Sequence, residues 1–283
     1  IDGTAISGVF SNASATKKKN TSFGYADRFD EKYDLVRTLR VGKYKYIRNY
    51  QPFNIDALYN FYRYEMLAFK EWDALYNSGN LNQEQSRFFE SKSPEGLYDI
   101  DQDPHEVNDL SKSTEHQEIL MRMREQLREK LAELPDLSFY PEPYLLEHAL
   151  ENPVAFGQNN QQEIKELISV ADLNLSSFQD VQRKIKKALA DENPWKRYWG
   201  LVVCTSFGKK AQTLIPQIKN LLNQDQENLV RARAMEYLML NQEFFDNIII
   251  EELLKKAKSK TEANLILNSL SLIKNLKPKL KFN

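Results

Sequence analysis

The sequence has a single cysteine among its 283 residues, so no disulfide bond can form within the chain. The neighbours of Cys204 include Val202, Val203 and Phe207, which predicts a buried thiol and not a reactive one. Runs of about eighteen apolar residues, the length that a membrane-spanning helix needs, are also missing. We therefore expect no segment of this chain to span a membrane.

Charge of either sign is not in excess. The 39 Lys and Arg residues nearly balance the 40 Asp and Glu residues, for a formal net charge of −1. This balance gives no electrostatic reason to expect nucleic acid or an anionic membrane as a partner. The only dense basic run, KKK at 17–19, lies in a Ser/Thr/Asn-rich stretch and reads as a solvated loop. The 41% hydrophobic content can bury at least one core, and the length permits two domains.

Motifs that carry catalytic or metal chemistry are missing as well. The three histidines, His105, His116 and His148, do not stand at metal-ligand spacing, and one cysteine cannot form a zinc site. No phosphate-binding glycine loop, nucleophile elbow or zinc-helix motif occurs. We expect no cofactor and no metal in this chain.

Residues 95–110, EGLYDIDQDPHEVNDL, form the densest local pattern. Leu97 lies in a short apolar run that predicts a strand, and a turn follows it. Asp103 is placed to cap a helix that has Pro104 at its first position, where the missing N–H has no cost. Glu106, three residues after the cap, would complete a capping box. The pattern predicts a strand, a tight turn and a capped helix.

An antiparallel hairpin is predicted upstream. In residues 34–50, DLVRTLRVGKYKYIRNY, apolar and polar residues alternate on both sides of Gly42, which suits the turn. Residues 22–26 read as a further short strand. Together with the strand at Leu97, these segments predict an antiparallel sheet of about four strands.

Three helices are predicted around these strands. One long helix runs from its cap Asn54 to Gly79, a short one contains residues 88–89, and a third has Thr114 and Gln117 as a capping box. The stripe expected to face the core in the first helix consists of Ile55, Leu58, Tyr59, Tyr62, Met66, Phe69 and Tyr76. The corresponding face of the third helix consists of Ile119, Leu120, Met123, Leu127 and Leu131.

The second half of the chain has a helical pattern. Prolines mark 136–160 as a linker with one short helix at 144–151, and helices are expected near 161–172, 178–190, 194–207, 209–222, 226–241, 244–258 and 261–275. Residues recur at a spacing of 33 or 34, as with Arg197 and Arg231, and DENPWKRYWGLVVCTSFG resembles the pattern of HEAT-like repeats. We expect both arginines to bond to carbonyls or acids of the adjacent repeat; a role in substrate binding is the alternative.

Two segments resemble a known family. LYDIDQDPHEVNDL and ADRFDEKYDLVRTLRVGKYKYIRNYQP are similar to the C-terminal subdomain of sulfatases of the alkaline-phosphatase superfamily, especially the bacterial group that resembles N-sulfoglucosamine sulfohydrolase. The opening IDGTAISGVF is similar to a segment late in their catalytic domain, and the start at Ile1 suggests that the chain was cut from a longer one. The resemblance implies an α+β subdomain at 1–135, followed after the linker by an all-α HEAT-like domain at 161–283, an order found in some members.

The resemblance also implies a reaction. These sulfatases use a formylglycine made within a Cys/Ser-x-Pro/Ala-x-Arg motif, a calcium ion held by acidic residues, and Lys and His groups around the sulfate. Cys204 is followed by TSFG, which lacks the motif. The expectation is that the full-length parent, periplasmic or secreted, hydrolyses a sulfate ester or N-sulfate of a glycan. The fragment would pair with the upstream catalytic domain of the same protein and be inactive alone. A non-catalytic helical scaffold that binds a protein or glycan partner is the alternative.

The resemblance further implies a candidate substrate-binding turn, DRFDE at 27–31, beside the cleft of the parent. Arg28 has the planar fork of donors that holds a sulfate or a carboxylate. Asp27 or Asp30 would accept hydrogen bonds from sugar hydroxyls. The alternative is that Arg28 pairs with Asp30 or Glu31 at the surface and contributes about 1 kcal/mol or less.

Overall fold

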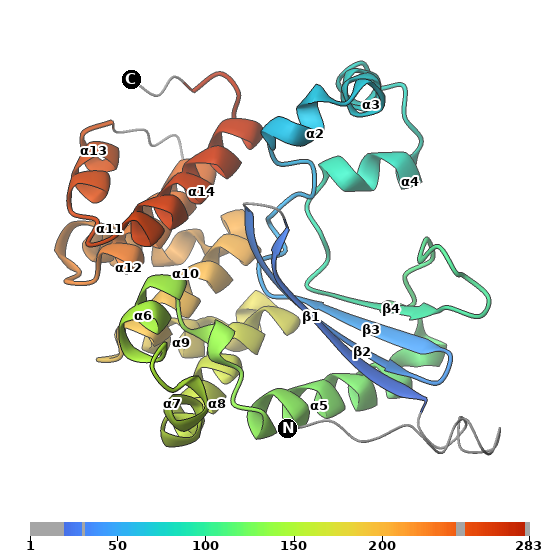
Figure 1. The fold of residues 1–283 in the computed structure, drawn as a ribbon, viewed down its shortest axis with the longest axis horizontal. Coiled ribbons are helices and arrows are strands. Elements are labelled where there is room, and N and C mark those ends of the chain that lie inside the picture. The colour runs from blue at the N-terminus through green and yellow to red at the C-terminus, as the bar shows by residue number, and fades with distance from the viewer. Residues whose placement is uncertain (1–19, 30–31, 242–246, 281–283) are drawn as a thin grey trace.

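The computed structural model describes residues 20–29, 32–241 and 247–280. Its first part holds a four-stranded antiparallel sheet in the order β1-β2-β3-β4 (Figure 1). The strands are β1 (Thr21–Phe29), β2 (Lys32–Val41), β3 (Tyr44–Asn49) and β4 (Glu95–Asp99). The prediction of an antiparallel sheet of about four strands is confirmed. The segment 1–10 that resembles the end of a catalytic domain lies outside the described residues.

The hairpin of β2 and β3 follows the sequence pattern. Gly42 has a φ of 62°, a conformation that L side chains rarely adopt, and Val41 pairs with Tyr44 across the two-residue turn. Tyr46 lies opposite both Leu39 of β2 and Leu97 of β4, and all three are buried on one face of the sheet. The period-two alternation therefore sets this face toward the core.

One long helix covers that face. Helix α5 (Gln117–Glu133) follows a 3₁₀ turn, η3 (Thr114–His116), and lies along the sheet (Figure 1). Its expected apolar face is confirmed at Leu120, Met123, Leu127 and Leu131, which are buried. The capping box was wrong, because the Gln117 side chain donates instead to the carbonyls of Ser111 and Ser113, at 2.8 and 3.1 Å.

The single long helix expected at 54–79 was wrong. The segment forms α2 (Phe61–Glu65) and α3 (Leu67–Asn77), followed by α4 (Gln83–Ser86) and the 3₁₀ turn η2 (Arg87–Phe89). Asn60, not Asn54, caps α2, and Met66 is extended with a ψ of 127°, which ends the helical phase. The predicted apolar stripe is therefore divided. Phe69 is buried, whereas Tyr62 is 76% exposed and Tyr59 is 56% exposed.

The capped helix expected at Pro104 was wrong too. Strand β4 and its turn form as predicted, but residues 100–113 then make a loop. The Asp103 carboxylate accepts from the backbone N–H of Asn108 at 2.7 Å and closes that loop instead of starting a helix. Glu106 has a φ of 55°, outside the helical region, and its carboxylate contacts Lys45 at 2.6 Å. The N–H of Leu110 donates to the carbonyl of Leu97, so the loop folds back on β4.

Helices form the second half, and the structure describes no strand after β4 among its residues (Figure 1). The 3₁₀ turns are η4 (Leu137–Phe139), η5 (Asp172–Leu175) and η6 (Gly208–Leu214). The expected helix at 209–222 begins as η6. The α-helices are α6 (Glu142–His148), α7 (Pro153–Asn159), α8 (Gln161–Ala171), α9 (Phe178–Ala188), α10 (Pro194–Phe207), α11 (Ile215–Gln224), α12 (Asn228–Asn241), α13 (Asn247–Lys255) and α14 (Lys260–Leu276). None of the helices in the described ranges is long and apolar enough to cross a membrane.

The repeat spacing has a structural counterpart. Arg197 of α10 pairs with Asp225, which follows α11, at 2.7 Å, and its guanidinium also reaches the carbonyl of Asp191. Thirty-four residues on, Arg231 of α12 pairs with Glu252 of α13 at 3.1 Å and donates to the carbonyl of Leu222. The prediction that both arginines bond to carbonyls and to acids of the next helix pair is confirmed. The assignment of these pairs to the HEAT type stays a prediction.

Aromatic packing joins the sheet to the helical half. Tyr50, which follows β3, packs edge-to-face against Phe139 with ring centroids 4.9 Å apart. The indole N–H of Trp199 in α10 donates to the carbonyl of Phe139 at 2.7 Å. All three residues are at most 2% exposed. The apolar cores of the two halves therefore form one continuous cluster.

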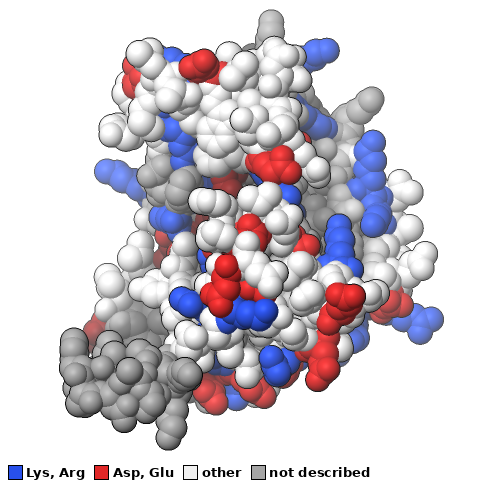
Figure 2. All heavy atoms as spheres, turned by 90° about the vertical axis from the view of Figure 1, so that its right-hand side faces the viewer, with Lys and Arg blue, Asp and Glu red and all other residues white. Residues whose placement is uncertain are grey.

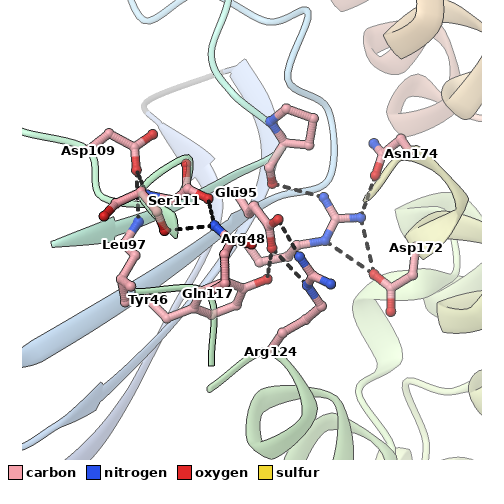
Figure 3. A network of polar contacts seen from close by, with 12 residues as sticks. Tyr46, Arg48, Glu95, Leu97, Asp109, Ser111, Gln117, Arg124, Asp172 and Asn174 are labelled. Carbon is pink, nitrogen blue, oxygen red and sulfur yellow. Dashed lines mark hydrogen bonds and ion pairs between the residues drawn. The ribbon is translucent and has the colours of Figure 1, made fainter. Parts of the chain in front are cut away.

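A buried arginine makes one of the polar links between the halves (Figure 3). Arg48 of β3 is 1% exposed, and its guanidinium donates to Asp172 and Asn174 of η5, at 3.1 and 2.7 Å. The carbonyls of Ala171 and Pro94 accept from the same group. Nearby, Glu95 of β4 accepts from Arg124 of α5 and from the Tyr46 hydroxyl, each at 2.9 Å. The network holds β3, β4, α5 and η5 in fixed relative positions.

Candidate functional site

The candidate turn begins at an irregularity in the pairing of β1 with β2. Ala26 pairs with Val36 and Arg28 with Tyr33, so the register shifts between Ala26 and Arg28. Asp27 of β1 lies opposite two residues of β2, Asp34 and Leu35, so β2 carries the extra residue, and such bulges redirect side chains at the ends of strands. The structure therefore brings Asp27 and Arg28 to the end of the sheet that faces residues 136–142. Asp30, the third candidate, lies outside the described residues.

Arg28 has its ion-pair partner far along the sequence. Its Nε lies 2.7 Å from Oε1 of Glu142, the first residue of α6, and its Nη2 contacts the other carboxylate oxygen. This two-point geometry is the fork that arginine also offers to a sulfate. The two side chains are 32% and 28% exposed. A pair this accessible contributes about 1 kcal/mol or less to stability.

Asp27 is held by the same segment. One carboxylate oxygen accepts from the hydroxyl of Ser138 at 2.9 Å, and the other lies 2.8 Å from a guanidinium nitrogen of Arg37. Arg37 is 2% exposed and pairs in turn with Asp136 at 2.6 Å. The segment 136–142 thus fixes the orientation of both described candidates.

Arg28 lies at a groove of about 780 Å³ on the face of the sheet opposite α5. Val36 of β2, Ile47 of β3 and Gly96 of β4 line its floor, and the ring of Tyr98 lies over Gly96. The wall opposite comes from α4, η2 and residues 90–93. Figure 2 shows the side of the molecule that carries α3, α4 and β4: its upper part is mostly uncharged, and acidic and basic side chains interleave below.

A cluster of four charges, of which Lys32 and Asp34 are buried, lies at one end of the groove. Lys92 pairs with Asp34 and lies 3.4 Å from Asp56, while Lys32 lies 4.0 and 3.8 Å from the same two carboxylates. Lys32 also donates to the carbonyl of Ile55. Burial lowers the pKa of Lys32 to about 8, because desolvation of the ammonium outweighs its attraction to Asp34. The cluster holds the start of β2 against residues 54–56.

Sequence reasoning missed this cluster and the partners of the candidate turn. Lys32 and Asp34 are two residues apart on a strand, but Asp56 and Lys92 come from loops with no recognisable pattern. Glu142 and Ser138 belong to a segment that reads as a proline-rich linker. Contacts at separations of more than 100 residues carry no local signal in one sequence.

The structure also bears on the calcium and formylglycine that the resemblance implies for the parent. Over 20–29, 32–241 and 247–280, no three His, Cys, Asp or Glu side chains converge to hold a metal ion. Cys204 is buried in α10, and desolvation raises the pKa of its thiol far above its usual range. The described residues therefore do not fit either group.

Comparison with models of known protein families finds no match. Among characterised proteins, the chain is similar to an ulvan-active sulfatase from Formosa agariphila, with 33% identity over 162 residues. The match covers 57% of this chain and 26% of the relative, so the chain spans about a quarter of the relative's length. This partial similarity supports the interpretation of the chain as part of a sulfatase.

Proposed function

We propose that the chain is the C-terminal part of a sulfatase whose parent hydrolyses sulfate esters or N-sulfates of a glycan. The observation that carries the proposal is the 33% identity over 162 residues to a sulfatase. The antiparallel sheet with α5 on one face agrees with the subdomain that the sequence motifs imply. Nucleophile and metal ligands would come from the upstream catalytic domain, so this chain alone is inactive.

The groove at Arg28 is the part of the fragment that would complete the substrate cleft. A sulfate ester that enters it would compete with Glu142 for the two donors of Arg28, because one fork cannot serve both anions fully. Asp27 and Asp30 would accept from sugar hydroxyls. Since the relative is described as ulvan-active, a sulfated polysaccharide is the substrate class to test first.

The residues at the groove have defined tasks in this proposal. Arg28 orients the sulfate, and the pairs of Arg37 with Asp136 and Asp27 keep the turn in place while substrate binds. The formylglycine would supply the nucleophile and the calcium ion would neutralise the sulfate, both in the catalytic domain. The fragment contributes binding and orientation, which lower the barrier by fixing the reacting group.

A non-catalytic scaffold is the second candidate. The equivalent contacts of Arg197 and Arg231 favour it, because stacked helix pairs present extended surfaces for a protein or a glycan. The coding sequence immediately upstream separates the two. A Cys/Ser-x-Pro/Ala-x-Arg motif in the same reading frame supports the sulfatase, and a frame that lacks it leaves only the scaffold.

A further inference from the structure

Positive charge is concentrated in one part of a chain that is neutral overall. Residues 181–224 hold nine Lys and Arg residues and two acidic residues, although the whole chain has a net charge of −1. The basic residues are Arg183, Lys184, Lys186, Lys187, Lys196, Arg197, Lys209, Lys210 and Lys219; the acidic ones are Asp191 and Glu192. This segment spans most of α9, α10, η6 and α11.

Helix α9 separates its charged side from its apolar side. Val181, Ile185 and Ala188 are buried on the side of α9 that packs against its neighbouring helices. Four exposed cations cover the opposite side, and none of them forms an ion pair within the described residues: Arg183, Lys184, Lys186 and Lys187. We call these four residues the basic face.

The basic face continues onto η6. Gln182 donates to Thr213 at 2.8 Å and Gln217 donates to the carbonyl of Lys186 at 3.1 Å, so η6 and α11 lie beside α9. Lys209 and Lys210 of η6 are exposed as well. Cations grouped in this way repel one another, and a bound polyanion would relieve that repulsion.

A groove of about 460 Å³ adjoins the basic face between α8, α9 and α10. Lys184 and Lys187 line one wall, and half-buried Val170 and Leu173 also line the groove. Lys196, which lines it too, is held by Glu166 at 2.7 Å and Asp191 at 3.5 Å. The groove therefore offers an apolar surface for the C–H face of a sugar ring beside two cations that lack ion-pair partners in the described part of the chain.

We propose that the basic face and this groove bind a sulfated polysaccharide at a site separate from the groove at Arg28. The proposal rests on the proposed function for the choice of ligand and deepens it, because such a site would hold a polymer while its sulfates are removed one by one.

Two other polyanions fit less well. A membrane-binding helix needs a free apolar face, and that of α9 is buried. Single-stranded nucleic acid needs exposed aromatic rings for its bases, and the only ring of α9, that of Phe178, packs half-buried against Phe207. Lysines act as point charges that suit sulfate groups without fixed geometry.

The test is a binding titration of the intact 283-residue chain with dextran sulfate at low salt, followed by fluorescence. The wild type should bind dextran sulfate and not uncharged dextran. Lys184→Gln/Lys187→Gln should weaken binding about tenfold, since each exposed lysine contact contributes about threefold to fivefold. Lys255→Gln/Lys256→Gln is the matched control, because it removes the same charge from cations that pair with Glu251 and Glu252.

The control should change the dissociation constant by less than about twofold. Equal weakening by both variants, or no binding by the wild type, overturns the proposal. So does equal or tighter binding of a single-stranded oligonucleotide or of anionic lipid vesicles that depends on the same two lysines. The assay needs no turnover, so it can succeed while the parent proves not to be a sulfatase, and it can fail while sulfatase activity is established.

Discussion

Replacement of Arg48 by methionine should destabilise the whole chain and not only the sheet. The guanidinium is 1% exposed and donates to Asp172, Asn174 and the carbonyls of Ala171 and Pro94. Methionine fills a similar volume but leaves these acceptors without their donor. Loss of one partner of a buried ion pair costs about 3–5 kcal/mol, because the other charge stays desolvated, and the 19% exposure of the Asp172 side chain puts the expected loss at the lower end of that range.

The expected loss is a large share of the about 5–15 kcal/mol that stabilises a typical protein. It corresponds to a drop in melting temperature of roughly 10 °C for a chain of this length. Burial raises the pKa of Asp172, whereas Arg48 opposes the rise. A group with a raised folded-state pKa loses stabilisation as pH rises through that pKa, so the variant should lose more at pH 8 than at pH 5.

Urea unfolding followed by circular dichroism and by tryptophan fluorescence measures this effect. Arg40→Met is the matched control in the neighbouring strand, since Arg40 is only half-buried and donates to the carbonyl of Gly42. The double variant Arg48→Met/Asp172→Asn should recover about 1 kcal/mol or more, because it removes the unpaired charge. A loss of unfolding free energy below about 1 kcal/mol for Arg48→Met would refute the role of Arg48 in linking the sheet to the helical half. Two separate unfolding transitions, one for each half, would refute it as well.

Three further changes test other parts of the structure. Between pH 7 and 9.5 the unfolding free energy of the wild type should rise by about 2 kcal/mol relative to that of Lys32→Met. The reason is that folded Lys32, with its pKa lowered to about 8, releases its proton at a lower pH than Lys32 in the unfolded chain does. A difference between the two proteins that stays constant over this pH range contradicts the burial of Lys32 in the charge cluster. Gly42→Ala should lower the free energy of thermal unfolding by about 1 kcal/mol, because the φ of 62° opposes a side chain at a position that is otherwise open. Gly42→Asn should lower it less, since Asn tolerates a positive φ better than Ala does. Equal losses for the two variants speak against this role of the backbone conformation. In the full-length parent, Arg28→Ala should lower kcat/KM about tenfold with a nearly unchanged Tm, whereas Glu142→Gln should not lower kcat/KM. Equal effects of the two variants on kcat/KM would show that the ion pair of Arg28 with Glu142 has only a structural role.

The sheet was predictable because its signal is local. Alternation on both sides of Gly42 sets the register, and a one-residue shift would expose Leu39 and Tyr46. The helices after residue 160 were predictable for a similar reason, since their apolar spacing persists over whole helices. The repeated positions of Arg197 and Arg231 even gave the right class of partner.

The errors arose where one local signal fits two structures. Asp103 accepts from a backbone N–H as a cap would, but that N–H belongs to Asn108 in a closed loop. The apolar spacing from Asn54 to Gly79 spans an extended residue, Met66, that no propensity marks. At the candidate site, the turn could be located from the sequence, whereas the pairing of Arg28 with Glu142 depends on how the chain returns after more than 100 residues.

Sulfate release is the measurement that tests the sulfatase assignment most directly. The full-length product of the reading frame that contains this chain would be incubated with a sulfated polysaccharide such as ulvan, and free sulfate would be measured by ion chromatography. The controls are the isolated 283-residue chain and a full-length variant with the Cys or Ser of the upstream motif replaced by alanine. The account predicts sulfate release by the full-length protein only. No release by that protein, or release by the isolated chain above the buffer blank, would contradict it.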